Sequence, residues 1–340
     1  MTLHRTLFVT QRAPRHQQAA LDAAPPELEV VMRQSPSKEA VLALLPDAEF
    51  FISERTGVID ADMIAAGKRL RLIQRLGSQT YDVDLDAARR AGIPVCCWPL
   101  TTCIMVAEHT LMLMLALAKR LGDMSHVAME AGDWGIKPRP CDANTFAYNW
   151  SGRRKLRSLS GSTVGILGMG EIGSELAPRL GCLGCTVLYN KRTRLPAATE
   201  AELNVRYASL AEIQAQSDFL CSLLPHSDET AQMINAAFIR AMKPGAYLIN
   251  TGSSTTLDEP EVAEAVRQGQ LAGLATDGYA WEPIRVDNPL LPLAHNPSLN
   301  VILTPHVAAG EVSAHRDARV QEYTNLRRVL AGEPLLHRLV

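Results

Sequence analysis

Short apolar runs alternate with helix-period patterns along most of the chain, and this alternation limits the possible folds more than any other feature. In such chains each helix crosses over the sheet and returns to a parallel strand. The first alternation predicts strands at 6–10, 28–32, 48–53, 70–77 and 93–98. The second predicts strands at 163–168, 186–190, 218–225, 246–252, 271–278 and 300–305. We therefore expect an α/β fold with two doubly wound parallel-sheet domains.

A long apolar helix is expected between the two alternations, at Thr101–Leu121. Its most apolar run, Ile104–Ala118, looks too short to span a bilayer and contains Glu108 and His109. The helix is apolar nearly all round, so more than one of its faces needs cover. The segment 132–157 is rich in Trp, Pro and Arg and has weak periodicity. We expect both pieces to hold a homodimer together.

Composition excludes several classes of protein. The chain has 340 residues, enough for two domains, and its formal net charge of -2 gives no electrostatic reason to bind nucleic acid or an anionic membrane. The seven cysteines form no disulfide framework, and the pair Cys182 and Cys185 has no second ligand pair for a metal. No signal-peptide core follows Met1. We expect a cytoplasmic protein without a metal site.

The stretch "GILGMGEIG" carries the strongest sign of a cofactor. It places Gly168, Gly170 and Gly173 in the G-x-G-x-x-G pattern, after a predicted strand and before a predicted helix. The first glycine permits a tight turn, the second lets the backbone approach a pyrophosphate, and the third lets helix and strand pack closely. Pro178 should bend or shorten the helix. We therefore predict a dinucleotide-binding site here, rather than a glycine turn without a ligand.

The end of the next strand indicates which dinucleotide is bound. An NAD site carries an acid there to bond the ribose 2'-hydroxyl. Here Lys191 lies 18 residues after Gly173, and Arg192, Thr193 and Arg194 follow it. A cationic cluster suits a 2'-phosphate, so NADP is the predicted cofactor. The alternative is NAD, with one arginine of a solvated turn stacked on its adenine.

Several pieces of the chain resemble the D-isomer-specific 2-hydroxyacid dehydrogenases, the family of D-lactate, phosphoglycerate, glyoxylate and hydroxypyruvate enzymes. The resemblance covers roughly 70–310 and rests on "DVDLDAARRAGIPV", "VAEHTLMLMLALAKR", "VGILGMGEIG", "MKPGAYLINTG", "GQLAGLATDGYAWEP" and "TPHVAAG". It implies a Rossmann cofactor domain at 104–306, inserted in a flavodoxin-like substrate domain at 1–103 and 307–340. It also implies that the long helix helps to form a dimer.

The resemblance implies a catalytic pair. His306, in "TPHVAAG", matches the family histidine that gives a proton to the carbonyl oxygen as hydride arrives, and takes it back in the reverse direction. Glu282, in "WEP", matches the acid that orients the imidazole and favours its charged form. Asp277 matches the aspartate at the nicotinamide end. The predicted cofactor contacts are Gly168, Gly170, Glu171, Ile172, Gly173, Lys191, Arg192, Thr193, Leu224, Pro225, Thr251, Gly252, Ser253, Asp277, His306 and Ala308.

The family arginine that holds the substrate carboxylate is missing. The family motif N-x-x-R-G reads here as Asn250 to Ser254, with Ser253 at the arginine position. A serine has no charge and cannot grip a carboxylate with two bonds. The facing loop keeps Gly77 but has Gln79 in place of a second glycine, and Leu100 also replaces a family glycine. We predict that Gly77, Ser78, Gln79 and Ser253 contact an unusual carbonyl substrate.

Three functions remain open at this stage. The first is an active NAD(P)-dependent oxidoreductase with an atypical small-molecule carbonyl substrate, which we favour because His306 and Glu282 are retained. The second is a non-catalytic dinucleotide-sensing protein, because the arginine is lost. The third is an ordinary 2-hydroxyacid dehydrogenase whose arginine comes from elsewhere. The candidates for that role are Arg285, Arg153 and Arg154.

Overall fold

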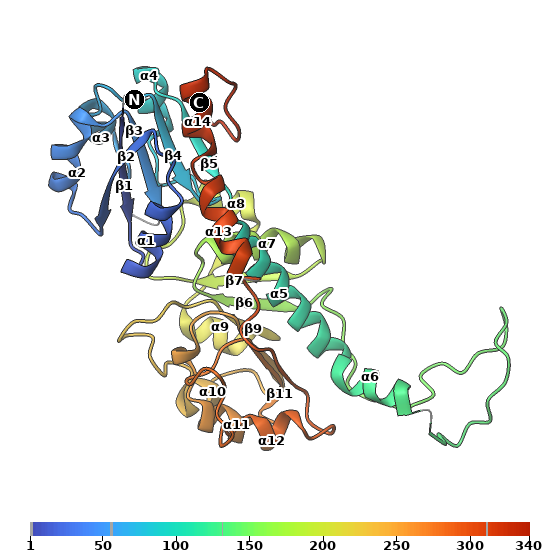
Figure 1. Ribbon diagram of the computed structural model, residues 1–340. Helices are drawn as coiled ribbons and strands as arrows, with labels where there is room; N and C mark the ends of the chain where they lie inside the picture. The colour runs from blue at the N-terminus through green and yellow to red at the C-terminus, as the bar shows by residue number, and fades with distance from the viewer. Residues whose placement is uncertain (1–2, 55–56, 131, 311) are drawn as a thin grey trace. The chain divides into compact units, whose positions relative to one another are not determined.

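The computed structural model describes residues 3–54, 57–130, 132–310 and 312–340, and the chain forms two compact units (Figure 1). The first unit consists of residues 1–105 and 309–340, and the second of residues 106–308. The second unit is therefore inserted in the first. The functional roles expected of the two units, substrate binding and cofactor binding, stay predictions.

The first unit is a five-stranded parallel sheet with strand order β2-β1-β3-β4-β5. This is the order of flavodoxin-like folds, as predicted. Asp60 and Asp84 cap α3 and α4, each accepting a bond from a backbone N–H three residues on. The elements are β1 (His4–Thr10), α1 (Pro14–Asp22), β2 (Leu28–Gln34), α2 (Lys38–Leu44), η1 (Leu45–Asp47), β3 (Phe50–Glu54), α3 (Ala61–Ala66), β4 (Leu72–Leu76), α4 (Leu85–Ala91) and β5 (Val95–Trp98).

Two C-terminal helices, α13 (Val312–Gln321) and α14 (Thr324–Ala331), return the chain to the first unit. Polar side chains that are buried in this unit hold them there. Arg319 lies 3.2 Å from Glu54 at the end of β3, and Asn325 donates to the side chain of Gln74 in β4 over 3.1 Å. Buried charged and polar groups are tolerated because they are paired in this way. The C-terminal segment is thus an integral part of the first unit.

The second unit is a seven-stranded parallel sheet with strand order β12-β11-β10-β9-β6-β7-β8. This is the Rossmann order with one additional edge strand, and it confirms the predicted fold class. The elements are α6 (Leu121–Glu130), β6 (Thr163–Leu167), α7 (Glu171–Cys182), β7 (Thr186–Asn190), α8 (Ala197–Leu203), β8 (Val205–Tyr207), α9 (Leu210–Gln216), β9 (Phe219–Ser222), α10 (Ala236–Arg240), β10 (Ala246–Asn250), η2 (Ser254–Thr256), α11 (Glu259–Arg267), β11 (Leu271–Thr276), α12 (Leu291–Ala294) and β12 (Val301–Leu303).

The long helix α5 is Thr101–Lys119, shorter at its C-terminal end than predicted. It ends because Arg120 adopts a left-handed conformation with φ of 52°, after which α6 begins. Beyond α6 the residues 132–157 form the long irregular segment visible at the right of Figure 1, as the weak periodicity indicated.

By length and composition alone, α5 could cross a membrane, and it is the one such helix among the described residues. The predicted apolar run Ile104–Ala118 is only part of this helix, which extends beyond the run at both ends. Half of its most apolar 18-residue window is buried within the protein.

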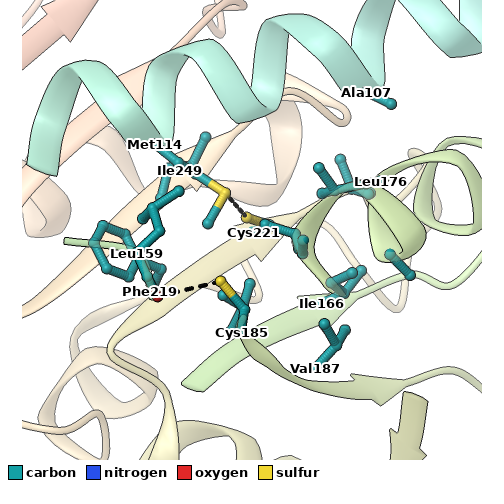
Figure 2. Close-up of a cluster of buried hydrophobic side chains, with 14 of the residues drawn as sticks. Ala107, Met114, Leu159, Ile166, Leu176, Cys185, Val187, Phe219, Cys221 and Ile249 are labelled. Carbon is teal, nitrogen blue, oxygen red and sulfur yellow. Dashed lines mark hydrogen bonds between the residues drawn. The ribbon is translucent and has the colours of Figure 1, made fainter. Parts of the chain in front are cut away.

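The core of the second unit forms between α5 and one face of the sheet. Figure 2 shows Met114 of α5 pointing at Cys221 of β9, with 3.5 Å between the two sulfur atoms. Leu117 and Leu176, from α5 and α7, are both fully buried in the same cluster. Burial raises the pKa of the Cys221 thiol, so this cysteine acts as a neutral core residue.

We expect Leu117→Ala to reduce the free energy of unfolding by about 2–5 kcal/mol, because it removes a fully buried side chain and leaves a cavity. The matched control is Leu183→Ala, at a leucine that is 37% exposed after α7, which should cost below about 1 kcal/mol. Urea unfolding followed by circular dichroism gives both values. An equal loss in the two variants would contradict the core described above.

Candidate active site

The glycine loop after β6 approaches the end of β9 so closely that no side chain fits between them. Gly168 has φ of 91°, and a Cβ atom there would lie 2.8 Å from the carbonyl oxygen of Leu223. Gly252, after β10, faces the same segment, because its Cβ would lie 2.7 Å from the backbone nitrogen of Leu224. Both positions require glycine on steric grounds. The loop therefore lies at the β6/β9 switch point of the sheet, where Rossmann folds bind ligands.

The start of α7 has the shape that a pyrophosphate needs. Gly170 is the N-cap residue, so no side chain caps the first turn of the helix. A Cβ atom at Gly170 would meet nothing within 4 Å, so the space above this turn is open. An uncapped helix N-terminus beside open space favours an anion. Pro178 does not end the helix, which continues to Cys182. A dinucleotide fits these residues.

The basic residues after β7 differ in their partners. Arg194 forms two bonds to Glu200, of 2.9 and 2.7 Å, and its guanidinium lies over the ring of Tyr207. The hydrogen bonds from Arg194 and Tyr189 lower the pKa of Glu200 to about 2, so the pair is charged across the physiological range. Arg192, in contrast, is 88% exposed and lies 3.7 Å from Glu229. A ligand phosphate would have to be held by the residues from 191 to 193, because Arg194 is committed to Glu200.

The turn after β10 carries Thr251, Gly252 and Ser253 and is fixed mainly by its backbone. The Ser253 N–H donates to the carbonyl of Leu224 over 2.8 Å, and the Ser253 carbonyl accepts from the hydroxyl of Thr256 over 2.7 Å. The side-chain hydroxyl of Ser253 lies 2.9 Å from that of Thr255. Position 253 thus presents a small neutral group.

Asp277 organises the segment that follows β12. Its carboxylate accepts three hydrogen bonds, from the hydroxyl of Thr304 (2.6 Å) and from the backbone N–H groups of Val307 (3.0 Å) and Ala308 (2.8 Å). His109 of α5 also lies 3.5 Å from it. The role that the family resemblance suggested for Asp277, at the nicotinamide end, stays a prediction. In the protein alone it positions the backbone on either side of His306.

His306 and Glu282 form a close pair within the second unit. The Nδ1 atom of His306 lies 2.7 Å from a carboxylate oxygen of Glu282, and the imidazole is 65% exposed. His306 has φ of 54°, a left-handed conformation that a non-glycine residue adopts only where its surroundings hold it. With Nδ1 on the carboxylate, Nε2 is available to exchange a proton with a bound molecule.

Glu282 is itself held by neighbours that sequence reasoning did not identify. Its other carboxylate oxygen accepts from the N–H of Tyr279 over 3.0 Å, and the hydroxyl of Tyr279 donates to the carbonyl of Thr304 over 2.9 Å. Burial, together with nearby acids, raises the pKa of Tyr279 to about 12, so it stays a neutral donor. Glu259 accepts from the N–H of Ala280 over 2.8 Å.

Tyr279 stands inside "GQLAGLATDGYAWEP" and Thr304 begins "TPHVAAG", but neither was given a role of its own from the sequence. His109 stands inside "VAEHT", which was used only for the resemblance.

The predicted substrate residues Gly77, Ser78 and Gln79 lie in the first unit, directly after β4. Gly77 has φ of 124° and donates to the carbonyl of Trp98 over 2.7 Å. Gln79 accepts from the hydroxyl of Tyr81 over 3.1 Å.

Two of the candidate replacement arginines already have partners. Arg285 forms two bonds to Asp287, of 2.9 and 2.8 Å, and Arg153 lies 3.0 Å from Asp123. Their present contacts therefore do not favour either of them as the missing carboxylate ligand.

The comparisons with known proteins agree with this geometry. Residues 111–308 match the family described as D-isomer specific 2-hydroxyacid dehydrogenase, NAD binding domain. Glyoxylate reductase from Aeropyrum pernix is 32% identical over 289 residues, which are 85% of this chain and 80% of the relative. D-3-phosphoglycerate dehydrogenase from Mycobacterium leprae is 30% identical over 321 residues. This chain covers 93% of its own length in that match and 56% of the relative.

A solved structure shows the same fold. The PH0520 protein from Pyrococcus horikoshii aligns with a TM-score of 0.58 at 28% identity, covering 100% of this chain and 95% of that one. The sequence match extends over more than half of the chain, and it includes the glycine loop and the turn that carries His306. The chain belongs to the D-isomer-specific 2-hydroxyacid dehydrogenase family.

Proposed function

We propose that the protein is an NAD(P)-dependent oxidoreductase that interconverts a carbonyl group and a secondary alcohol. The observation that carries this proposal is the 2.7 Å contact between His306 and Glu282, in the same unit as the glycine loop. A sensor that only bound the dinucleotide would have no need of an exposed imidazole paired with a carboxylate. This favours an enzyme over the non-catalytic alternative.

The residues of the chain have separate tasks in this reaction. A bound nicotinamide dinucleotide supplies or accepts the hydride. His306 gives a proton from Nε2 to the carbonyl oxygen during reduction and removes it from the hydroxyl during oxidation. Glu282 holds Nδ1 and stabilises the charged imidazolium. Asp277 positions the histidine through the two N–H groups that follow it in the chain.

We further propose that the substrate differs from a small 2-oxo acid. The relatives are named for glyoxylate and D-3-phosphoglycerate, both of which carry a carboxylate. Ser253 offers only a hydroxyl where the family motif has arginine, and Gln79 offers a neutral amide. A bulkier or less charged carbonyl compound suits these groups. An ordinary 2-hydroxyacid dehydrogenase is the second candidate, and it requires an arginine such as Arg154 to take over the carboxylate.

NADP is the proposed cofactor, with NAD as the alternative. Support comes from Lys191, Arg192 and Thr193 at the position where an NAD site carries an acid. We also propose a homodimer that acts in the cytoplasm. Exposed apolar side chains on α5 and on the segment after α6 support the dimer, including Met112, Leu115, Phe146 and Tyr148.

His306→Gln should lower kcat by about 10²- to 10⁴-fold, because it removes the proton donor while keeping a side chain of similar size. Cofactor affinity should change by no more than a few-fold. The measurements are turnover with the best substrate of a carbonyl panel and dinucleotide binding by fluorescence. His295→Gln, at an exposed histidine, is the matched control. Near-normal turnover of the His306 variant would sink the proposed mechanism.

NADPH should bind more tightly than NADH, and alanine at both Lys191 and Arg192 should weaken NADPH much more than NADH. The reason is that the two cations would face the 2'-phosphate that NADH lacks. Dissociation constants are compared at one fixed salt concentration. Arg206→Ala, which removes an exposed cation on β8, is the control. Equal or tighter binding of NADH by the unaltered protein contradicts this assignment.

Ser253→Arg should raise kcat/KM for pyruvate by roughly 30- to several-thousand-fold. This estimate comes from the cost of about 2–5 kcal/mol for losing one partner of a buried charged pair, at about 1.4 kcal/mol per tenfold. Pyruvamide serves as the control, because it lacks the carboxylate and should gain little from the arginine. The proposed substrate class is wrong if the unaltered protein already turns over simple 2-oxo acids with efficiencies above about 10⁴ M⁻¹s⁻¹.

A further inference from the structure

A cavity lies in the second unit, at the end of the strands opposite to the glycine loop. It has a volume of about 360 Å³ and is lined by the residues that lead into β10 and β11, among them Gly245 and Gly269. The glycine loop and the Ser253 turn follow the carboxyl ends of β6 and β10. In a parallel sheet, amino and carboxyl ends of the strands lie at opposite edges. This cavity is therefore separate from the candidate active site.

Three cations line the cavity, and its lining contains no acid. Arg120 is held in place, because it donates to the carbonyls of Pro297 and Ser298, each over 3.2 Å, and to Asp123 over 3.2 Å. Lys155 is exposed, and its ammonium group has no partner among the described residues. One cation is thus fixed and another is free to meet a ligand.

Arg157, the third cation, is anchored by its backbone. Its N–H donates to the carbonyl of Ala118 over 2.8 Å, and its guanidinium lies 5.8 Å from the centre of the Tyr247 ring. The nearest acid is Asp218 at 3.9 Å, but Lys243 already forms a closer contact of 2.7 Å with that carboxylate. The positive charge of the cavity is therefore only partly offset.

A tyrosine side chain also lines the cavity and adds a hydroxyl group to its three cations. Tyr247 lines it and is 2% exposed, with its ring stacked on Phe219 at a centroid distance of 4.7 Å. In the described part of the chain, nothing accepts from or donates to this hydroxyl. Burial raises the pKa of Tyr247, so the group is a neutral donor. The hydroxyl can therefore donate a hydrogen bond to a molecule in the cavity.

We propose that this basic cavity binds a phosphate-bearing small molecule. Lys155 and Arg157 hold the phosphate, and the Tyr247 hydroxyl donates a hydrogen bond to it. Arg120 adds positive charge from a fixed position. Phosphate suits this set because it accepts several charge-assisted hydrogen bonds at once. The volume exceeds that of a phosphate ion, which leaves room for an organic group attached to it.

The test uses the full chain saturated with NADPH, so that phosphate cannot enter the dinucleotide site. Inorganic phosphate and glycerol 3-phosphate are titrated separately by calorimetry, with ionic strength held constant by chloride. We expect saturable binding of one phosphate group per chain. Tighter binding of the ester identifies an organic phosphate as the ligand, whereas equal affinities identify the free ion.

Three variants locate the binding. Alanine at both Lys155 and Arg157 should weaken it at least about tenfold, because both charged donors are lost. Tyr247→Phe should weaken it several-fold, since it removes only the hydroxyl and keeps the stacked ring. Arg240→Ala, at an exposed cation on α10, should leave it unchanged.

Three results would overturn the proposal. One is the absence of saturable binding up to about 20 mM phosphate, a range that reveals even millimolar affinity. The second is an equal affinity in the unaltered protein and the Lys155/Arg157 double variant. The third is binding that occurs only when NADPH is absent. None of these outcomes depends on catalytic activity, so they are distinguishable from a failure of the proposed oxidoreductase function.

Discussion

The carboxylate of Asp277 is the group on which the geometry of the candidate active site depends. Three hydrogen bonds converge on it from Thr304, Val307 and Ala308, on both sides of His306 in the chain. A left-handed backbone conformation at a residue other than glycine costs about 1–3 kcal/mol. It persists where several contacts hold the backbone on both sides of the residue. The His306 imidazole is thereby turned toward Glu282, although most of its surface is exposed. A pair of exposed side chains can thus keep a defined geometry because the backbone beneath it is fixed.

A second constraint comes from the close approach of three loops at the carboxyl edge of the Rossmann sheet. Gly168 and Gly252 both face the segment Leu223–Leu224, with no room for a Cβ atom on either side. These contacts place the glycine loop and the Ser253 turn next to one another within the second unit. Gly170 differs, because a Cβ atom there would meet no neighbouring atom within 4 Å. Glycine at this position leaves space for a ligand, whereas Gly168 and Gly252 leave space for the backbone of a neighbouring segment.

Much of this could be predicted from the sequence, because strand and helix periods are local properties. The two sheets, the glycine loop and the positions of His306 and Glu282 after strands followed from local patterns and the family resemblance. β8 was missed because Val205–Tyr207 is a three-residue edge strand without an apolar run. The partners of Asp277 were missed because Thr304 and His109 approach it only in the folded sheet. The break at Arg120 was also missed, because a backbone conformation with positive φ has no marker when the residue is not glycine.

The contacts around Ser253 explain how this position can differ from the family motif without loss of the turn. Its N–H bonds to the carbonyl of Leu224 and its carbonyl accepts from Thr256, so the turn depends on the main chain at 253. The side chain adds a single bond to Thr255. The steric requirement falls on Gly252, one residue earlier, where the backbone approach is closest. The side chain at 253 can therefore vary, while the glycine before it keeps the turn in place. Because the two adjacent residues have separate tasks, the change of substrate class that we propose requires no change in the backbone of the turn.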